Sequence, residues 1–292
     1  MTLPLANPSP RDAIRLMPEA GVPAAIAGAE FRYSRLTAAA VAGVMVISSA
    51  ILIAIGLAQG NPFTYYIAAL ILVFLWIYQA MVLARFRSSN WLVRLDERGM
   101  YLKFRSYLNH HFAATDRVVA YIPFRDIRLT KVVREVQEVP DTDGGGTSTR
   151  QRTVIEIELE DDAPELAEAL EAERRAEPPR IARWYGSTAG KYRHYPVRMG
   201  APRIIAIEWG VRPAAARFVE IMAVHAPVEA TVAVRDYTAL GALKRHEQES
   251  KLLELVESGR IMDAIRLARS LYGYDVTEAK QFVDGLSSRA KA

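Results

Sequence analysis

The chain has 292 residues, of which 51% are hydrophobic and 24% charged, and its formal net charge is +4. Because it contains no cysteine, disulfide bonds, thiolate chemistry and cysteine-ligated zinc are excluded. A net charge of +4 is too small to indicate nucleic-acid binding, so no nucleic acid is expected among the partners.

Residues 1–35 predict a loosely ordered arm. Proline, which interrupts both helices and strands, recurs along this segment at Pro4, Pro8, Pro10, Pro18 and Pro23. A short helix is expected only over Asp12–Met17.

The next segment, residues 36–84, contains no Lys, Arg, Asp, Glu or His. Two apolar runs, Leu36–Ala58 and Tyr65–Ala84, flank the polar segment Gln59–Thr64, whose glycine and proline favour a turn. As helices the runs would be roughly 35 Å and 30 Å long, enough to cross a hydrocarbon core of about 30 Å. We therefore predict a two-span transmembrane hairpin, with a helical hairpin buried in a soluble core as the alternative.

Basic residues predict the orientation of this hairpin. Arg32 and Arg35 precede the first span, Arg85 and Arg87 follow the second, and the turn carries no charge. The positive-inside rule then places both termini in the cytoplasm.

The hairpin is interpreted as an anchor in the lipid bilayer, because intramembrane ionisable residues, which mark transport paths, are absent from its sequence. Ala39, Ala42 and Gly43 are small residues of the kind that allow close helix packing. A homo-oligomer formed through the transmembrane helices therefore stays open.

Alternation of apolar and polar residues predicts strands after the hairpin. Strands are expected around Met100–Arg105, over Val154–Glu160 and over Pro202–Trp209, and an amphipathic helix is expected over Arg212–Val224.

An insertion at residues 161–201 lies between the last two of these strands. It combines an acidic helix, Ala163–Glu177, with a basic loop, Pro178–Arg198. We interpret the two as solvated segments that attract each other, and the alternative is a recognition loop at the rim of the domain.

Two stretches carry a resemblance to a known family. They are Trp91–Asn109, with the core Glu97-Arg-Gly-Met-Tyr-Leu-Lys-Phe-Arg-Ser-Tyr-Leu-Asn109, and Ile122-Pro-Phe-Arg-Asp-Ile127. Followed by strands and one closing helix, they resemble the bacterial membrane-linked pleckstrin-homology (PH) domains. The resemblance implies an antiparallel β-sandwich or partly open barrel over residues 88–226, capped by its last helix, at the bacterial cytoplasmic membrane. The expected fold class is thus a membrane α-hairpin plus an α+β domain.

After a linker at residues 227–246, in which Val228–Tyr237 is a possible strand, helical periodicity returns over residues 247–288 and predicts a small helical module. Gly259 and Gly273 are expected to end two of its helices. Asp275 and Glu278 have the spacing of a capping box that starts a third.

Within this module, Leu271–Lys280 and Gln281-Phe-Val-Asp284 resemble the helix–turn–helix of the C-terminal domain of the ribosomal stalk protein. In that family the element helps to contact translation GTPases. The resemblance implies a docking role for the tail, with Tyr274, Thr277 and Lys280 as candidate partner-docking residues.

No catalytic, cofactor or metal site is indicated by the sequence. His110 and His111 are adjacent, so on a strand they would point to opposite faces, and Gly144–Gly146 lacks the Lys-Ser/Thr of a phosphate-binding loop. One basic set, Arg94, Lys103 and Arg105, has the spacing seen in phosphoinositide-binding PH domains. Lys103 and Arg105 would share one strand face and could grip an anionic headgroup, unless they are ordinary outward-facing residues.

We therefore expect a non-enzymatic, multi-pass membrane protein that presents a cytoplasmic PH-like scaffold and a helical tail to protein or peptide partners. Two alternatives stay open. One is an anionic-lipid sensor that uses Lys103 and Arg105, and the other is an accessory subunit of a membrane enzyme or transporter.

Overall fold

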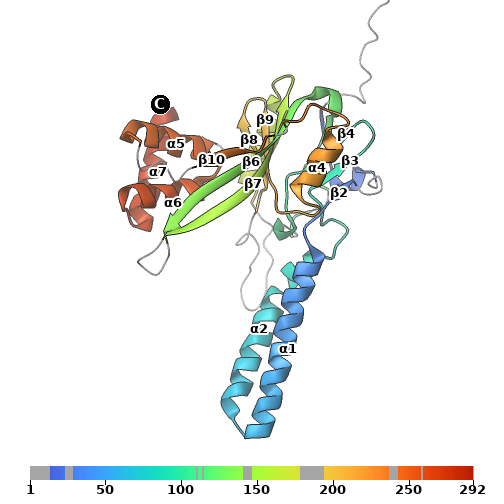
Figure 1. Ribbon diagram of the computed structural model, residues 1–292, viewed down its shortest axis with the longest axis vertical. Coiled ribbons are helices and arrows are strands. Elements are labelled where there is room, and N and C mark those ends of the chain that lie inside the picture. The colour runs from blue at the N-terminus through green and yellow to red at the C-terminus, as the bar shows by residue number, and fades with distance from the viewer. Residues whose placement is uncertain are drawn as a thin grey trace, which may run out of the picture.

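The computed structural model describes residues 14–23, 29–109, 111–113, 115–140, 147–177, 194–229, 231–236, 243–257 and 259–291. Within these ranges the chain is an α+β protein with two long apolar helices, two mostly antiparallel sheets and further helices. The two apolar helices project together as a rod from the sheets, and the C-terminal helices lie at the side of the long strands β6 and β7 (Figure 1).

The rod is formed by α1 (Arg35–Gln59) and α2 (Pro62–Ala84). Ser34 caps α1 by accepting a hydrogen bond from the Thr37 amide at 3.1 Å, and Gly60, at φ 65°, ends it. Because Pro62 already occupies the first turn of α2, where a missing N–H costs nothing, the turn is shorter than the predicted Gln59–Thr64.

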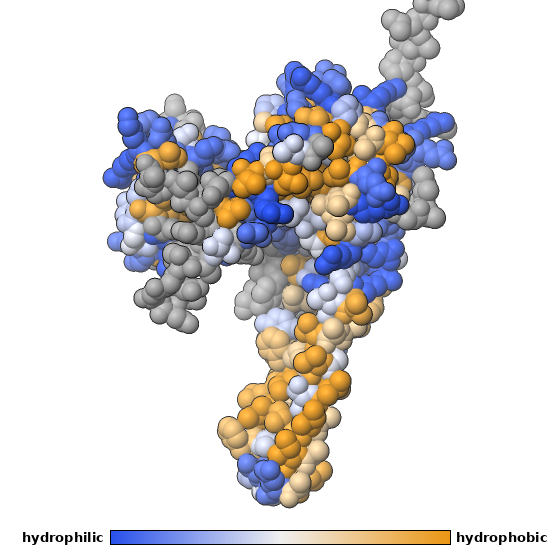
Figure 2. Space-filling model, viewed as in Figure 1, coloured by the Kyte–Doolittle hydropathy of each residue, from blue (hydrophilic) through white to orange (hydrophobic). Residues whose placement is uncertain are grey.

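Both helices are long and apolar enough to cross a membrane, and they are the only two of this kind in the part of the chain that the structure describes. Their hydrophobic side chains cover the surface of the rod (Figure 2). The helices approach closely at Gly56, where a Cβ atom would clash with Thr64 Oγ1. A soluble core helix is mostly buried, whereas only 11% of the apolar window of each helix is buried here.

The first sheet contains strands from both sides of the hairpin. Its strands are β1 (Arg15–Met17), β2 (Glu30–Phe31), β3 (Val93–Leu95), β4 (Gly99–Lys103) and β5 (Val119–Pro123), in the order β1-β5-β4-β3-β2. All of its pairs are antiparallel.

The prediction for the N-terminal arm is therefore wrong in part. Where a helix is expected over Asp12–Met17, residues 15–17 form β1 and pair with β5. Leu16 packs against the hydrophobic core, and the edge of β5 supplies backbone partners for β1 that the sequence alone does not reveal. Residues 1–13 lie outside the described residues.

The second sheet is built on the long pair β6 (Ile127–Pro140) and β7 (Thr147–Leu159). The remaining strands are β8 (Val197–Ala201), β9 (Ile204–Glu208) and β10 (Ala233–Asp236), in the order β10-β6-β7-β9-β8. Only the β10–β6 pair is parallel. The insertion contains α3 (Pro164–Arg175), where an acidic helix is expected.

Strand β8 is not predicted by the sequence pattern, because its residues fall within the insertion and its basic loop. Val197 is buried and pairs across to Ile207, so a tertiary contact turns this short stretch into a strand. The rest of the expected loop, residues 178–193, lies outside the described residues.

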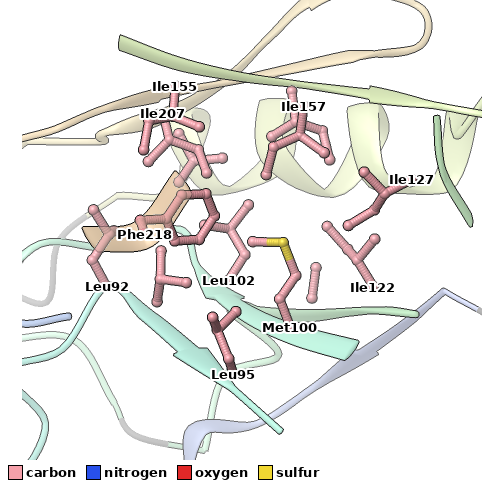
Figure 3. Close-up of a cluster of buried hydrophobic side chains, with 14 of the residues drawn as sticks. Leu92, Leu95, Met100, Leu102, Ile122, Ile127, Ile155, Ile157, Ile207 and Phe218 are labelled. Atoms are coloured by element: carbon pink, nitrogen blue, oxygen red, sulfur yellow. The ribbon is translucent and has the colours of Figure 1, made fainter. Parts of the chain in front are cut away.

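The inward faces of the two sheets form one hydrophobic core (Figure 3). The inward-facing half of the alternation is confirmed here, because Met100, Leu102, Ile155 and Ile157 are fully buried. Lys103 and Glu156, on the opposite faces of their strands, are buried too, because other segments cover them. The helix α4 (Ala215–Met222) closes the core with Phe218, which is also fully buried. It begins at Ala215 instead of Arg212, because Ala214 still has extended backbone angles.

The tail folds into α5 (Arg245–Glu257), α6 (Ile261–Tyr272) and α7 (Val276–Lys291). These helices bury their own hydrophobic cluster, which is separate from the core of the sheets and includes Leu252, Ala268 and Val283. Gly259 and Gly273 adopt φ +73° and +69° at the helix ends, as predicted. The capping box is also confirmed, because the Asp275 amide donates to Glu278 Oε2 at 2.9 Å and the Glu278 amide to Asp275 Oδ1 at 2.8 Å.

The hairpin is fixed to the sheets by a buried amide. The Asn90 side chain donates to the carbonyl oxygens of Tyr33, which precedes α1, and of Arg85, which follows α2. Arg85 lies 4.2 Å from the centre of the Tyr107 ring. One side chain therefore ties together the two points at which the chain enters and leaves the rod.

We expect Phe218→Ala to destabilise the sheets by about 3–5 kcal/mol, because it removes a fully buried ring and leaves a cavity. Phe218 packs edge-on against Phe31, with 5.4 Å between ring centres. The measurement is urea unfolding of the detergent-solubilised chain, followed by tryptophan fluorescence. Arg217→Ala, an exposed neighbour on α4, is the control and should change stability by less than about 0.5 kcal/mol.

Candidate functional site

The basic residues singled out in the first sheet are buried, with 7% of the Lys103 side chain and 6% of the Arg105 side chain exposed. Lys103 Nζ lies 2.8 Å from Glu19 Oε2 and donates to the Ser89 carbonyl at 2.7 Å. Arg105 Nη2 lies 2.7 Å from Asp116 Oδ2, and Arg105 also pairs with Glu173 on α3. Burial lowers the pKa of Lys103, since water no longer solvates its charge.

The expectation that Lys103 and Arg105 face outward is therefore wrong. Their carboxylate partners include Glu19 of the N-terminal arm and Glu173 of the insertion, too far away in sequence to be identified from strand periodicity. Arg94 on β3 pairs within the first sheet, with Nε 3.1 Å from Glu30 Oε2 on β2 and its guanidinium 4.4 Å from the centre of the Trp91 ring. Lys103 and Arg105 thus attach outer segments, whereas Arg94 links neighbouring strands.

The tail residues suggested by the stalk-protein resemblance lie at the start of α7. Thr277 and Lys280 are exposed, whereas Tyr274 is half-buried and packs against Tyr272 and Phe282, with ring centres 5.4 and 5.5 Å away. Their role in docking stays a prediction.

The outer face of the second sheet carries charged side chains around a small apolar cluster of Val133, Val154 and Ala206. Glu135 on β6 and Glu156 on β7 are 2% and 3% exposed. Lys131 lies opposite Glu156 in the β6–β7 register and its Nζ is 3.1 Å from Glu156 Oε2. Arg235 on β10 makes a two-pronged contact with Glu156, at 2.7 and 3.2 Å.

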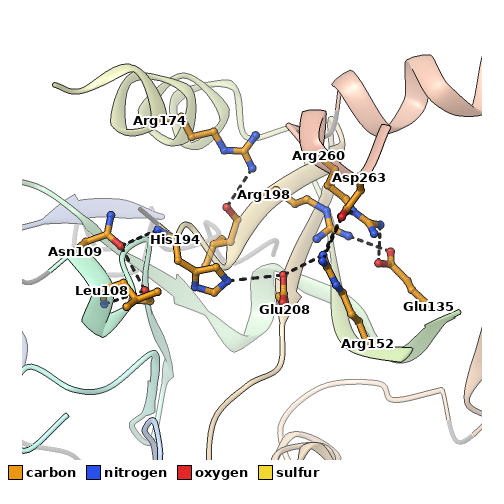
Figure 4. Close-up of polar contacts among 12 residues, drawn as sticks. Leu108, Asn109, Glu135, Arg152, Arg174, His194, Arg198, Glu208, Arg260 and Asp263 are labelled. Carbon is orange, nitrogen blue, oxygen red and sulfur yellow. Dashed lines mark hydrogen bonds and ion pairs between the residues drawn. The ribbon is translucent and has the colours of Figure 1, made fainter. Parts of the chain in front are cut away.

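The helical tail covers this face by a reciprocal exchange of charges (Figure 4). Arg260 of the tail places Nη1 2.6 Å from Glu135 Oε2 on the sheet. In return, Arg152 of the sheet donates to both oxygens of Asp263 on α6, at 2.8 and 3.2 Å. Arg198 on β8 also donates to Glu135, at 3.0 Å. At this joint between the second sheet and the tail, each side thus supplies both a cation and a carboxylate, so the buried charges lie beside charges of opposite sign.

Two carboxylates at this joint have lowered pKa values. His194, whose Nε2 lies 3.8 Å from Glu208 Oε2, together with Arg152 and Arg198, lowers the pKa of Glu208 to about 2. Although burial raises the pKa of Asp263, Arg152 and Arg260 hold it below its ordinary value. Both groups therefore stabilise the joint in their ionised forms.

Beside the joint lies a groove of about 910 Å³. It runs between α3, the segment of residues 194–198, the strands β7 and β9, and the turn from α5 to α6. Arg174 of α3 reaches into it and donates to the Val197 carbonyl at 3.5 Å. A Cβ atom on Gly259 would clash with the Arg174 guanidinium, so the glycine that ends α5 also makes room for this side chain.

The groove could hold an anion, because arginines from α3, the sheet and the tail converge on it. It offers less to a metal ion, since the described residues contain no group of three or more His, Asp or Glu side chains placed to bind one. The groove could not be predicted from the sequence because its residues come from segments that are far apart along the chain. The one local signal was the excess of arginine among residues 174–198.

Arg260→Gln should loosen the tail from the sheet, because Glu135 would lose its partner on the tail and keep Arg198. We expect a cost of about 1–3 kcal/mol, the range for a buried polar group left underpaired. Since the chain has no cysteine, Arg128→Cys and Ser288→Cys allow a dye pair to report the separation of sheet and tail. Energy transfer should fall in Arg260→Gln and stay unchanged in Arg245→Gln, an exposed cation that pairs within α5.

Acid should also weaken the structure through Glu208. Its folded pKa of about 2 lies below the ordinary value of 4.5, so its contribution to stability is complete above about pH 4.5 and is lost as the pH falls toward 2. Urea unfolding across this range should show a smaller loss of stability in Glu208→Gln than in the unmodified chain. Glu165→Gln, on an exposed part of α3, should retain the full loss.

Comparison with known proteins gives no family assignment: no family model, curated protein or solved structure matches the chain. Its function is therefore inferred from the two apolar helices, the buried charge exchange and the groove.

Proposed function

We propose that this chain is a non-enzymatic, membrane-anchored interaction protein. In this proposal α1 and α2 cross the bacterial cytoplasmic membrane, both termini lie in the cytoplasm, and the two sheets with α4 form a PH-like scaffold. The scaffold carries the helical tail and presents it, together with the groove, to a protein or peptide partner.

The observation that carries the proposal is the way the tail is attached. Its three helices have their own hydrophobic cluster, distinct from that of the sheets, and ion pairs join it to the outer face of the second sheet. A module built in this way adds a surface to the scaffold without contributing to its core. We infer from this attachment that the tail is held in place to bind a protein or peptide partner.

The attachment of the hairpin supports the same proposal. Asn90 holds the chain on both sides of the rod, and Arg85 is engaged with the Ser34 carbonyl at 3.3 Å and with Tyr107. A fixed joint of this kind would keep the scaffold at a defined height and orientation above a membrane. The groove and the exposed start of α7 would then face the same cytoplasmic space.

Two measurements test the proposal. In cells, the chain should stay in the membrane pellet after salt and carbonate washes, and external protease should leave its tail intact. Release into the supernatant, or cleavage of the tail from outside, would contradict the anchor and its orientation.

The role of the tail is tested by capture of partners in mild detergent. Ala268→Asp places a charge in the fully buried centre of the tail and should unfold the module, so partners that need the tail should be lost. Asp284→Asn, on an exposed position of α7, is the matched control and should retain them. An unchanged partner set in Ala268→Asp would remove the tail from the proposed function.

A further inference from the structure

The groove beside the tail has a surplus of positive charge. Its arginines are Arg152, Arg174, Arg175, Arg198, Arg260 and Arg266, and its carboxylates are Glu171, Glu208, Glu257 and Asp263. Each central carboxylate is shared between cations. Asp263 pairs with Arg152, Arg260 and Arg266 at 2.8, 2.9 and 3.2 Å, and Glu135 beneath them pairs with Arg198 and Arg260. Further negative charge would therefore be attracted into the groove.

Arg174 adds a partly desolvated cation at the same place. Burial lowers its pKa, which means that its surroundings stabilise the charged form less well than water does. Arg174 thus adds to the positive charge of the groove. The first turn of α6, which has no side-chain cap at its N-terminus, also borders the groove and brings the positive end of a helix dipole to it.

The tail also brings apolar side chains to the groove, beside its own charged ones. Val256, Ile261 and Met262 line it, and 47% of Ile261 and 59% of Met262 are exposed. Large apolar side chains left exposed next to arginines suit a ligand with both carboxylates and apolar groups. An inorganic anion would contact only the arginines.

We propose that the groove binds a short acidic peptide segment of a protein partner, whose carboxylates face the arginines of α3 and the sheet and whose apolar side chains contact Ile261 and Met262. This proposal rests on the proposed interaction function and names the chemistry of the partner. Arginine is well suited to the task, because its planar guanidinium can donate two parallel hydrogen bonds to one carboxylate.

The test uses the full chain in discs of zwitterionic lipid and a fluorescent peptide that contains several Glu and two Leu spaced by Gly and Ser. A second peptide has Gln in place of every Glu, and empty discs are the blank. Anisotropy should show binding of the Glu peptide that weakens as salt is added, and the Gln peptide should bind at least roughly tenfold more weakly. Equal binding of the two peptides would overturn the proposal.

Charge reversal locates the binding in the groove. Arg175→Glu with Arg266→Gln changes side chains that are 76% and 35% exposed, and the neutral Gln places no like charge beside Asp263, so the fold should tolerate both changes, and affinity should fall by at least roughly tenfold. Arg217→Glu on α4, 50% exposed and paired with Glu220 at 2.8 Å, is the matched control and should bind normally. Equal loss in the control would show that the attraction is general and would refute the site.

Two further measurements distinguish a peptide site from a site for small anions. Met262→Ser should weaken the Glu peptide without changing its salt dependence, because it removes only the apolar contact. Inorganic phosphate that displaces the peptide as strongly as an excess of unlabelled peptide would instead indicate a site for small anions and overturn the peptide proposal. If partner capture depends on the tail while the Glu peptide does not bind, this inference fails and the interaction function stands.

Discussion

The exchange of buried charges between the second sheet and the tail is the constraint on which the arrangement of this protein depends. Arg260 pairs with Glu135 and Arg152 with Asp263, so separating the tail from the sheet would break ion pairs of both orientations. Each group would then keep only partners on its own side, such as Asp263 for Arg260 on the tail and Arg198 for Glu135 on the sheet. Buried ion pairs contribute little net stability compared with well-packed apolar groups, but breaking them is costly. The position of the tail on the second sheet is therefore set by which charged side chains lie opposite each other, whereas the two sheets are joined by an apolar core.

The same device recurs where the N-terminal arm and α3 meet the scaffold. Glu19 brings the N-terminal arm to Lys103, and Glu173 brings α3 to Arg105. In each case a cation in or just after β4 pairs with a carboxylate from a segment far away in sequence. The scaffold thus uses its hydrophobic residues for the sandwich core and its buried charges to choose which segments pack against the outside.

The use of ion pairs to attach the tail explains why the groove lies beside the contact between the tail and the second sheet. The tail is held along one line of ion pairs, and its aliphatic side chains at the start of α6 stay partly exposed beside that line. The arginines of α3 line the same groove. A surface that combines cations with exposed aliphatic groups follows from docking a helical module by charge instead of by a shared apolar core.

The sequence by itself determined those helices, strands and helix ends that depend on interactions between residues close together in the chain. The absence of charge over residues 36–84 indicated two helices of membrane-spanning length, alternation placed Ile155 and Ile157 in the core, and Asp275 with Glu278 started α7 as expected. Local patterns failed where a distant partner decides the outcome. Residues 15–17 form a strand because they pair with the edge of β5, and β8 forms because it pairs with β9.

The polar contacts between segments far apart in sequence were decided by tertiary structure alone. The sequence shows that Lys103 and Arg105 are basic and lie two positions apart, but a solvated cation and a buried, paired one look identical there. Only the folded chain brings Glu19 and Glu173 to them and sets Arg174 of the insertion against Gly259 of the tail. Helix periodicity and hydrophobic length are carried by neighbouring residues, whereas the pairing of charges depends on distances between segments that only folding fixes.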